Sequence, residues 1–322
     1  MKIFNQKFPR ISFFLRGSRN RSCSPGSLSS YFLICTLASG SGRGAGGEFV
    51  KANKSMSIPK PIIPNEHGAW AVLFVPMIVA STVAGAWTFE LVCLAFSALG
   101  VFMSYVPLQF LMKSWMGDVQ NAEKLKQSHF WSAVYLGFGI AWAVPILMKG
   151  FVLLPAFGIL GAIFFLLSFA LSRRFKKNIL SDSVSVLGLT LSAPGAYYVA
   201  TGVLDQTALL LWLWSVLFFE CGVFYVHMKI KAIGLKKPAL TWKEKLTVGR
   251  LNVLYHVLAV VAVAFLTAQF GTPRLVIVAF VPMVVHAIYG TLNLSSRVRF
   301  KNLGFLLLAQ SFLFAGMIAA AY

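Results

Sequence analysis

Residues 64–87 read PNEHGAWAVLFVPMIVASTVAGAW, a short polar and ionisable cluster followed by a long apolar run. From Ala69 onward the run holds no charged side chain, and it is long enough to cross a bilayer as a helix, which takes about 20 residues. Comparable apolar runs recur along the rest of the chain. The stretch therefore predicts a membrane-spanning helix that begins with polar residues.

The composition extends this prediction to the whole chain. Of 322 residues, 58% are hydrophobic and 12% are charged, whereas soluble domains carry about 25% charged residues. Helices are expected as the spanning elements, because lipid leaves the backbone groups of open strands without partners. We expect an all-α, polytopic transmembrane helix bundle with about nine spans, at residues 69–87, 89–111, 129–148, 151–171, 179–201, 207–227, 250–270, 274–293 and 303–322.

Basic residues are distributed unevenly among the loops. The chain has 29 Lys and Arg against 9 Asp and Glu, and the loops after spans two, four, six and eight hold most of the basic residues that lie beyond the first span. By the positive-inside rule, this alternation predicts a cytoplasmic N-terminus and a C-terminus on the outside. The same placement explains the basic excess without nucleic acid, which we do not expect as a partner.

Residues 1–55 differ in kind from the rest. They are rich in Arg and Ser, contain Glu48 as their one acidic residue, and hold no apolar run long enough to span. We expect a disordered extension that is either a targeting segment or sequence upstream of a true start at Met56. Residues 56–322 are expected to form a single multi-spanning domain, in a bacterial inner (plasma) membrane, or in an organellar membrane if the extension is a transit peptide.

Polar residues near the predicted cytoplasmic ends of the spans are the candidates for a site. Glu66 and Glu220 are candidate catalytic residues, and Glu220 lies about 10 Å deeper than His227 at 1.5 Å per residue. The candidate substrate-binding residues are His67, His227, Arg250, Asn252, His256, His286, Asn293 and Arg297.

Structural explanations stand beside these functional ones. Glu66 in a first helical turn would interact favourably with the helix macrodipole, which explains it as well as a catalytic role does. His256 and His286 are explained at least as well by hydrogen bonds between helices.

Several features bear on chemistry and packing. The chain has no HExxH, P-loop or GxSxG motif, no paired Cys/His spacing and only three aspartates, at 118, 182 and 205. We therefore expect no metal site and identify no cofactor. The segment 192–195, Ser-Ala-Pro-Gly, predicts a helix break, and the pairs Gly137/Gly139 and Gly158/Gly161 predict close helix packing.

The segment 65–76, NEHGAWAVLFVP, resembles the opening of the YwiC-like family of bacterial integral membrane proteins. The specific part is the EHGAW core followed by an apolar run and a proline, so the motif residues are Glu66, His67, Gly68 and Trp70. The resemblance implies a multi-spanning membrane protein and supports Met56 as the start. It implies no particular reaction.

A second likeness concerns topology. Nine helices with polar residues at the cytoplasmic ends of spans two and six are similar to the architecture of the UbiA prenyltransferase superfamily. That family places Asp-rich motifs in these two regions, where this chain has GDVQNAE at 117–123 and Glu220 with His227. Because the acidic density is missing, magnesium-dependent prenyl transfer is not expected.

Three functions are compatible with these features. The first is a protein that binds or processes an anionic amphiphile, lipid or isoprenoid-like, at a cytoplasmic-side cavity, where cations hold the anion. The second is a proton-coupled secondary transporter of a small molecule, with Glu220 and the histidines as a relay. The third is an assembly partner of a membrane complex. The lipid bilayer is the expected surrounding in each case, whether the protein is an enzyme is left open, and the oligomeric state is not predicted.

Overall fold

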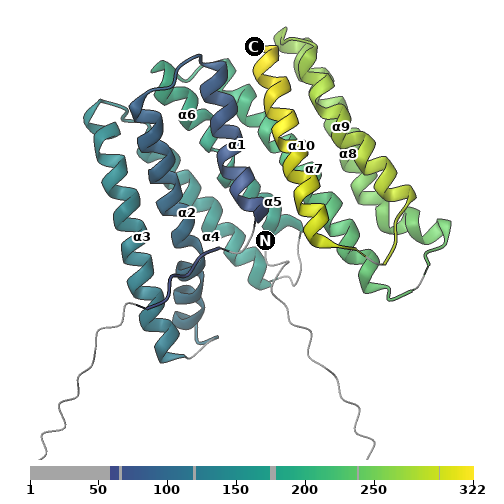
Figure 1. Cartoon of the computed structure of the whole chain (residues 1–322), viewed down its shortest axis with the longest axis horizontal. Coiled ribbons are helices and arrows are strands. Elements are labelled where there is room, and N and C mark those ends of the chain that lie inside the picture. The colour runs from purple at the N-terminus through teal and green to yellow at the C-terminus, as the bar shows by residue number, and fades with distance from the viewer. Residues whose placement is uncertain (1–58, 65–66, 119–120, 175–178, 238, 297) are drawn as a thin grey trace, which may run out of the picture. The chain divides into compact units, whose positions relative to one another are not determined.

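The described part of the chain forms helices joined by loops. The computed structural model describes residues 59–64, 67–118, 121–174, 179–237, 239–296 and 298–322. These residues form ten helices and no strand (Figure 1): α1 (His67–Val83), α2 (Phe89–Trp115), α3 (Ala122–Met148), α4 (Leu154–Arg174), α5 (Ile179–Leu189), α6 (Ser192–Thr201), α7 (Gln206–Gly234), α8 (Trp242–Phe270), α9 (Leu275–Leu292) and α10 (Phe300–Ala321). The all-α prediction is confirmed. The predicted extension, residues 1–55, lies outside the described residues.

Within the described residues, eight helical segments are long and apolar enough to cross a membrane. They are α2, α3, α4, α5 taken together with α6, and α7 to α10. The remaining predicted span corresponds to α1, which is apolar but has 17 residues, or about 26 Å at 1.5 Å per residue. The polytopic bundle is thus confirmed, while the side of the membrane on which each terminus lies stays a prediction.

Several helices extend beyond the predicted spans. Helix α3 begins at Ala122 rather than 129, and α8 begins at Trp242 rather than 250. Both starts are capped: Asn121 Oδ1 accepts from the backbone N–H of Lys124 at 2.9 Å, and Thr241 and Glu244 form a capping box. Hydropathy locates the apolar part of a helix, whereas side-chain caps set where the helix begins, and here the two are about two turns apart.

The predicted break in span five is present. Helix α5 ends at Leu189 and α6 begins at Ser192, so Pro194, which has no N–H, lies in the first turn of α6. The N–H of Ala193 bonds to the carbonyl of Thr190 at 3.0 Å, and Ser192 Oγ donates to the carbonyl of Leu73 on α1 at 2.7 Å. The break is therefore held in place by α1.

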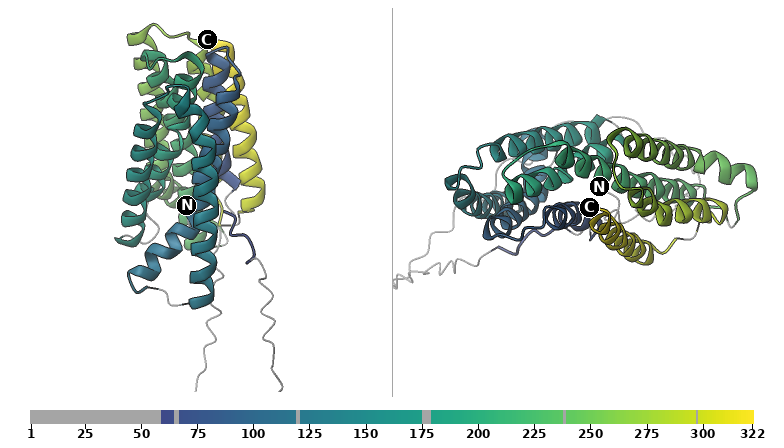
Figure 2. Two further views of the ribbon diagram at one scale, coloured as in Figure 1. Left: turned by 90° about the vertical axis from the view of Figure 1, so that its left-hand side faces the viewer. Right: turned by 90° about the horizontal axis from the view of Figure 1, so that it is seen from above.

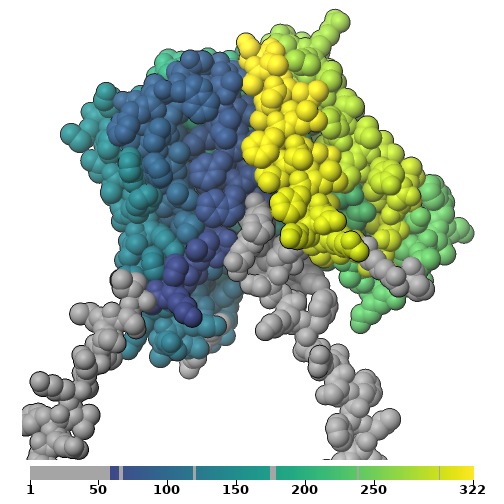
Figure 3. Space-filling view, in the orientation of Figure 1, coloured from purple at the N-terminus to yellow at the C-terminus, as the bar shows by residue number. Residues whose placement is uncertain are grey.

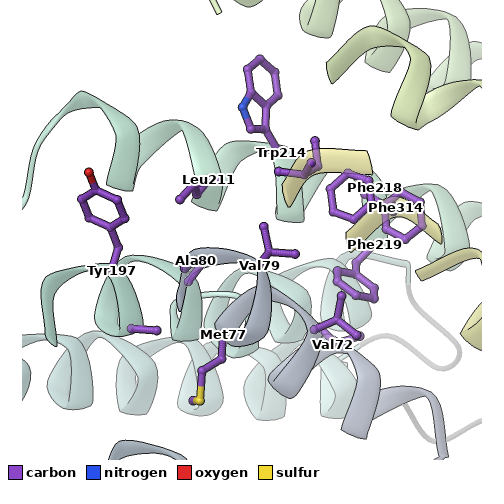
Figure 4. Packing of buried hydrophobic residues seen from close by; sticks show 14 of the residues in the cluster. Val72, Met77, Val79, Ala80, Tyr197, Leu211, Trp214, Phe218, Phe219 and Phe314 are labelled. Atoms are coloured by element: carbon purple, nitrogen blue, oxygen red, sulfur yellow. The ribbon is translucent and has the colours of Figure 1, made fainter. Parts of the chain in front are cut away.

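Helix α7 packs against α1, α5, α6 and α8, while α1 packs against α6 and α10. The helices are inclined to one another by different amounts (Figure 2), and α1 and α10 lie side by side on one face (Figure 3). Between them and α7 lies the main apolar core, which contains Val72, Val79, Trp214, Phe218 and Phe314 (Figure 4). The rings of Phe218 and Phe314 stack at 4.1 Å.

Helices α2 and α3 form the closest pair around two glycines. A Cβ on Gly100 would lie 2.6 Å from the backbone nitrogen of Gly139, so the two backbones approach as only glycine permits. The packing role predicted for Gly139 is confirmed. The same prediction is wrong for Gly137, Gly158 and Gly161, where an added Cβ would meet no atom within 4 Å.

Gly100→Ala is expected to lower the free energy of unfolding by about 1–3 kcal/mol, because the added methyl forces α2 away from α3. Gly137→Ala is the matched control on the same helix pair. Since its Cβ meets open space, it is expected to be neutral or slightly stabilising. Unfolding in mixed detergent micelles measures both variants, and equal stability of the two would contradict the close contact.

Candidate functional site

An apolar cavity of about 600 Å³ lies among the first six helices. Its walls come from α1 to α6, and none of the described residues that line it is Lys, Arg, His, Asp or Glu. The polar groups on its surface are Ser97, Ser104, Tyr105, Ser185 and Ser192. Small-molecule sites have volumes of this order and are mostly apolar with a few placed polar groups. We call it the α1–α6 cavity.

Small residues and the helix break make room for the α1–α6 cavity. Gly158 and Gly161 line it on α4, where a side chain would otherwise fill the space. Leu191 and Ser192, at the break between α5 and α6, also line it. Interrupted backbone at membrane depth is tolerated where it is buried in protein or lines a cavity. The break between α5 and α6 therefore forms part of the cavity wall.

Described residues in and beside the polar motif line this cavity. Pro64 and Ala69 both line it, and the indole of Trp70 packs edge-to-face at 5.1 Å on Phe102, another lining residue. Glu66 lies outside the described residues, and α1 begins at His67, whose side chain is also not described. In sequence, both ionisable motif residues stand between two lining residues.

A second group of polar residues joins α5 to α7. His227 Nε2 donates to Asp182 Oδ2 at 2.8 Å, and Ser183 Oγ donates to Glu220 Oε2 at 2.7 Å. Asp182, Glu220 and His227 are all buried. We call Asp182, Ser183, Glu220 and His227 the α5–α7 polar cluster. The sequence singles out Glu220 and His227 but not Asp182, whose one signal is that a rare aspartate opens a span.

The other predicted residues lie on the far side of α7. Asn252 Nδ2 donates to Thr291 Oγ1 at 3.2 Å, which links α8 to α9. His256 Nδ1 donates to the carbonyl of Asn252 at 2.7 Å, within α8. His286 Nδ1 donates to Gln310 Oε1 at 3.1 Å, which links α9 to α10. These contacts match the structural explanation given for His286.

The remaining candidates are at the surface or undescribed. Arg250 and Asn293 are exposed, and Asn293 Nδ2 donates to the carbonyl of Tyr289 at 3.2 Å. Arg297 lies outside the described residues. None of the described candidates in α7, α8 and α9 lines the α1–α6 cavity. These residues therefore take part in separate contacts within or between helices, and the structure does not place them in the cavity.

Among the described residues, no group of three or more His, Cys, Asp or Glu side chains is placed to hold a metal ion. Cys93 and Cys221 are buried free thiols. In an apolar surrounding such thiols behave as small hydrophobic groups.

The YwiC-like protein family model matches residues 63–197. The "Uncharacterized protein YwiC" of Bacillus subtilis (strain 168) is 24% identical to this chain over 229 residues, which are 71% of this chain and 85% of the relative. No solved structure matches. The family match begins just before the polar motif and includes every described residue that lines the α1–α6 cavity.

Proposed function

We propose that this chain, which belongs to the YwiC-like family, binds an anionic amphiphile, with the apolar chain in the α1–α6 cavity and the charged head at the end where α1 begins. The observation that carries the proposal is the cavity itself. The described residues that line it all lie within the family-matched residues 63–197, and they include Ala69 of the EHGAW motif and Pro64 just before the motif. A bacterial plasma membrane is the proposed location.

The apolar walls suit a hydrocarbon chain but supply little binding free energy by hydrophobicity. A chain that leaves lipid for the α1–α6 cavity exchanges one apolar surrounding for another, so the hydrophobic gain that drives binding in water is absent. Affinity and selectivity then depend on how well the chain packs and on contacts made by the head. This is why a polar motif at one end of the cavity matters.

Positive charge lies near that end. Lys113 follows the last lining residue of α2, Leu108, by five residues, or about 7.5 Å along the axis. Arg173 and Arg174 lie in the last turn of α4, and one acidic residue, Asp118, pairs with Arg173 at 3.1 Å, so this end of α4 keeps a net positive charge. The amino end of α1 adds the positive end of a helix dipole. These groups favour an anionic head, with His67 as a proposed contact and Glu66 as the proposed acid or base if the ligand is processed.

Lipid analysis of the purified protein tests this proposal. Mass spectrometry of an organic extract is expected to show one class of acidic amphiphile enriched about tenfold or more over the membrane from which the protein came, which corresponds to about 1.4 kcal/mol of preference. An extract with the same composition as that membrane would contradict a specific site.

A further inference from the structure

We propose that the α5–α7 polar cluster binds a proton in linkage with the α1–α6 cavity, so that an anionic amphiphile binds more tightly when the cluster is protonated. This inference rests on the proposed function, because it needs a ligand in the cavity. It adds a second site, which holds a proton and is assigned to Asp182, Ser183, Glu220 and His227. The sequence gives no sign of a link between the cluster and the cavity. In the structure, no residue of the cluster lines the cavity.

Helix α5 connects the two sites. Ser185 and Gly188 line the α1–α6 cavity, while Asp182 and Ser183, one turn earlier, bond to α7. Ser168 on α4 holds the same turn, because its Oγ donates to the carbonyl of Ser181 at 2.8 Å and lies 2.7 Å from Ser185 Oγ. A ligand that contacts Ser185 or Gly188 therefore contacts α5 within about two turns of Asp182 and Ser183.

Helix α5 is short and bounded. It has 11 residues and ends at the break before α6; in this proposal, a bound ligand shifts α5 and the break takes up the change. Discontinuous helices of this kind form the substrate and ion sites of many membrane carriers. A shift of α5 changes the 2.7 Å contact of Ser183 with Glu220 and the 2.8 Å contact of Asp182 with His227.

The chemistry of the cluster sets the sign of the linkage. Two buried carboxylates and one imidazole carry a net charge of −1 when all three are ionised, and uptake of one solvent proton by Glu220 brings the charge to zero. An anionic head at the same end of the bundle repels the ionised form. Ligand binding therefore favours proton uptake, and by reciprocity a lower pH favours ligand binding.

Other titratable groups lie on the helices that pack against α5 and α7. They are His67 on α1, Arg173 and Arg174 on α4, Tyr197 and Tyr198 on α6, Cys221, Tyr225, Lys229 and Lys231 on α7, Lys243, Glu244, Lys245, Arg250, Tyr255 and His256 on α8, His286 and Tyr289 on α9, Lys301 on α10, and Tyr322 at the end of α10. Among these groups, histidine is the residue type whose ordinary pKa lies between pH 5 and 8. His286 bonds to Gln310 on α10, away from α5, and serves as a control.

The test uses the full chain in phosphatidylcholine nanodiscs and a hexadecyl sulfate that carries a diazirine, whose own charge is constant over the pH range. Photolabelled residues are located by mass spectrometry. Wild-type cavity labelling is expected to rise about fivefold or more between about pH 8 and about pH 5.5. Glu220→Gln is expected to lose this response and keep the labelling, while His286→Gln keeps both. Ser183→Ala, a milder change, is expected to move the response to higher pH, because the carboxylate loses a donor that favours its ionised form.

Two results separate the claims. Absence of cavity labelling in the wild type at every pH would overturn the proposed function, and this inference with it. Cavity labelling that is independent of pH, or that keeps its full pH response in both Glu220→Gln and Ser183→Ala, would overturn the linkage and leave amphiphile binding in place.

Discussion

Replacing His227 with alanine is expected to lower the free energy of unfolding by about 3 kcal/mol, because it removes the imidazole from a buried carboxylate. His227 Nε2 lies 2.8 Å from Asp182 Oδ2, and the two side chains are 7% and 9% exposed. The bond also joins α7 to α5, the short helix at the break, so its loss weakens the attachment of one wall of the cavity. Chemical unfolding in mixed micelles measures the effect.

His286→Ala is the matched control for this change. It also removes an imidazole, but the hydrogen-bond partner of this imidazole is the amide of Gln310 and not a carboxylate. Side-chain hydrogen bonds between helices in membrane proteins contribute about 0.6 kcal/mol on average. The double variant Asp182→Ala/His227→Ala is expected to recover part of the loss, since it removes the buried carboxylate together with its partner. Equal destabilisation by His227→Ala and His286→Ala would contradict a strong buried pair.

Gly161→Phe is expected to reduce labelling of the α1–α6 cavity by about tenfold or more, equivalent to about 1.4 kcal/mol of lost binding. Gly161 lines the cavity, and a Cβ built on it meets no atom within 4 Å, so the aromatic ring has room to enter and fill the space. The fold is therefore expected to tolerate the substitution while the ligand is excluded. The diazirine hexadecyl sulfate is the probe.

Gly137→Phe controls for the added ring. Gly137 is exposed on α3, its Cβ would also meet open space, and it does not line the cavity. Labelling is expected to stay at the wild-type level in this variant. If both phenylalanine variants labelled as strongly as the wild type, the label would not be bound where Gly161 lies.

The helical bundle could be predicted from sequence because it depends on local features. Apolar runs long enough to span gave the helices, and a proline beside a glycine gave the break between α5 and α6. Helix ends were less accurate, since α3 and α8 begin at side-chain caps about two turns before their apolar parts. A hydropathy pattern carries no information about those caps.

The site was harder to predict because it depends on which helix faces which. Glu220 is buried, as its isolation in an apolar span suggested, but its neighbour Ser183 and the Asp182–His227 pair come from contacts across 37 and 45 residues of sequence. The role of Gly158 and Gly161 could not be predicted for the same reason. Small residues at this spacing serve close packing or leave a cavity, and the partner helix decides between them.

The most direct measurement is a map of the residues that diazirine hexadecyl sulfate labels in the wild-type protein in phosphatidylcholine nanodiscs. The account predicts labels on residues that line the α1–α6 cavity, such as Phe102, Phe165 and Leu189, with competition by unlabelled hexadecyl sulfate. Labels confined to exposed side chains of α8, such as Leu254, Val261 and Phe265, and unaffected by the competitor would contradict it.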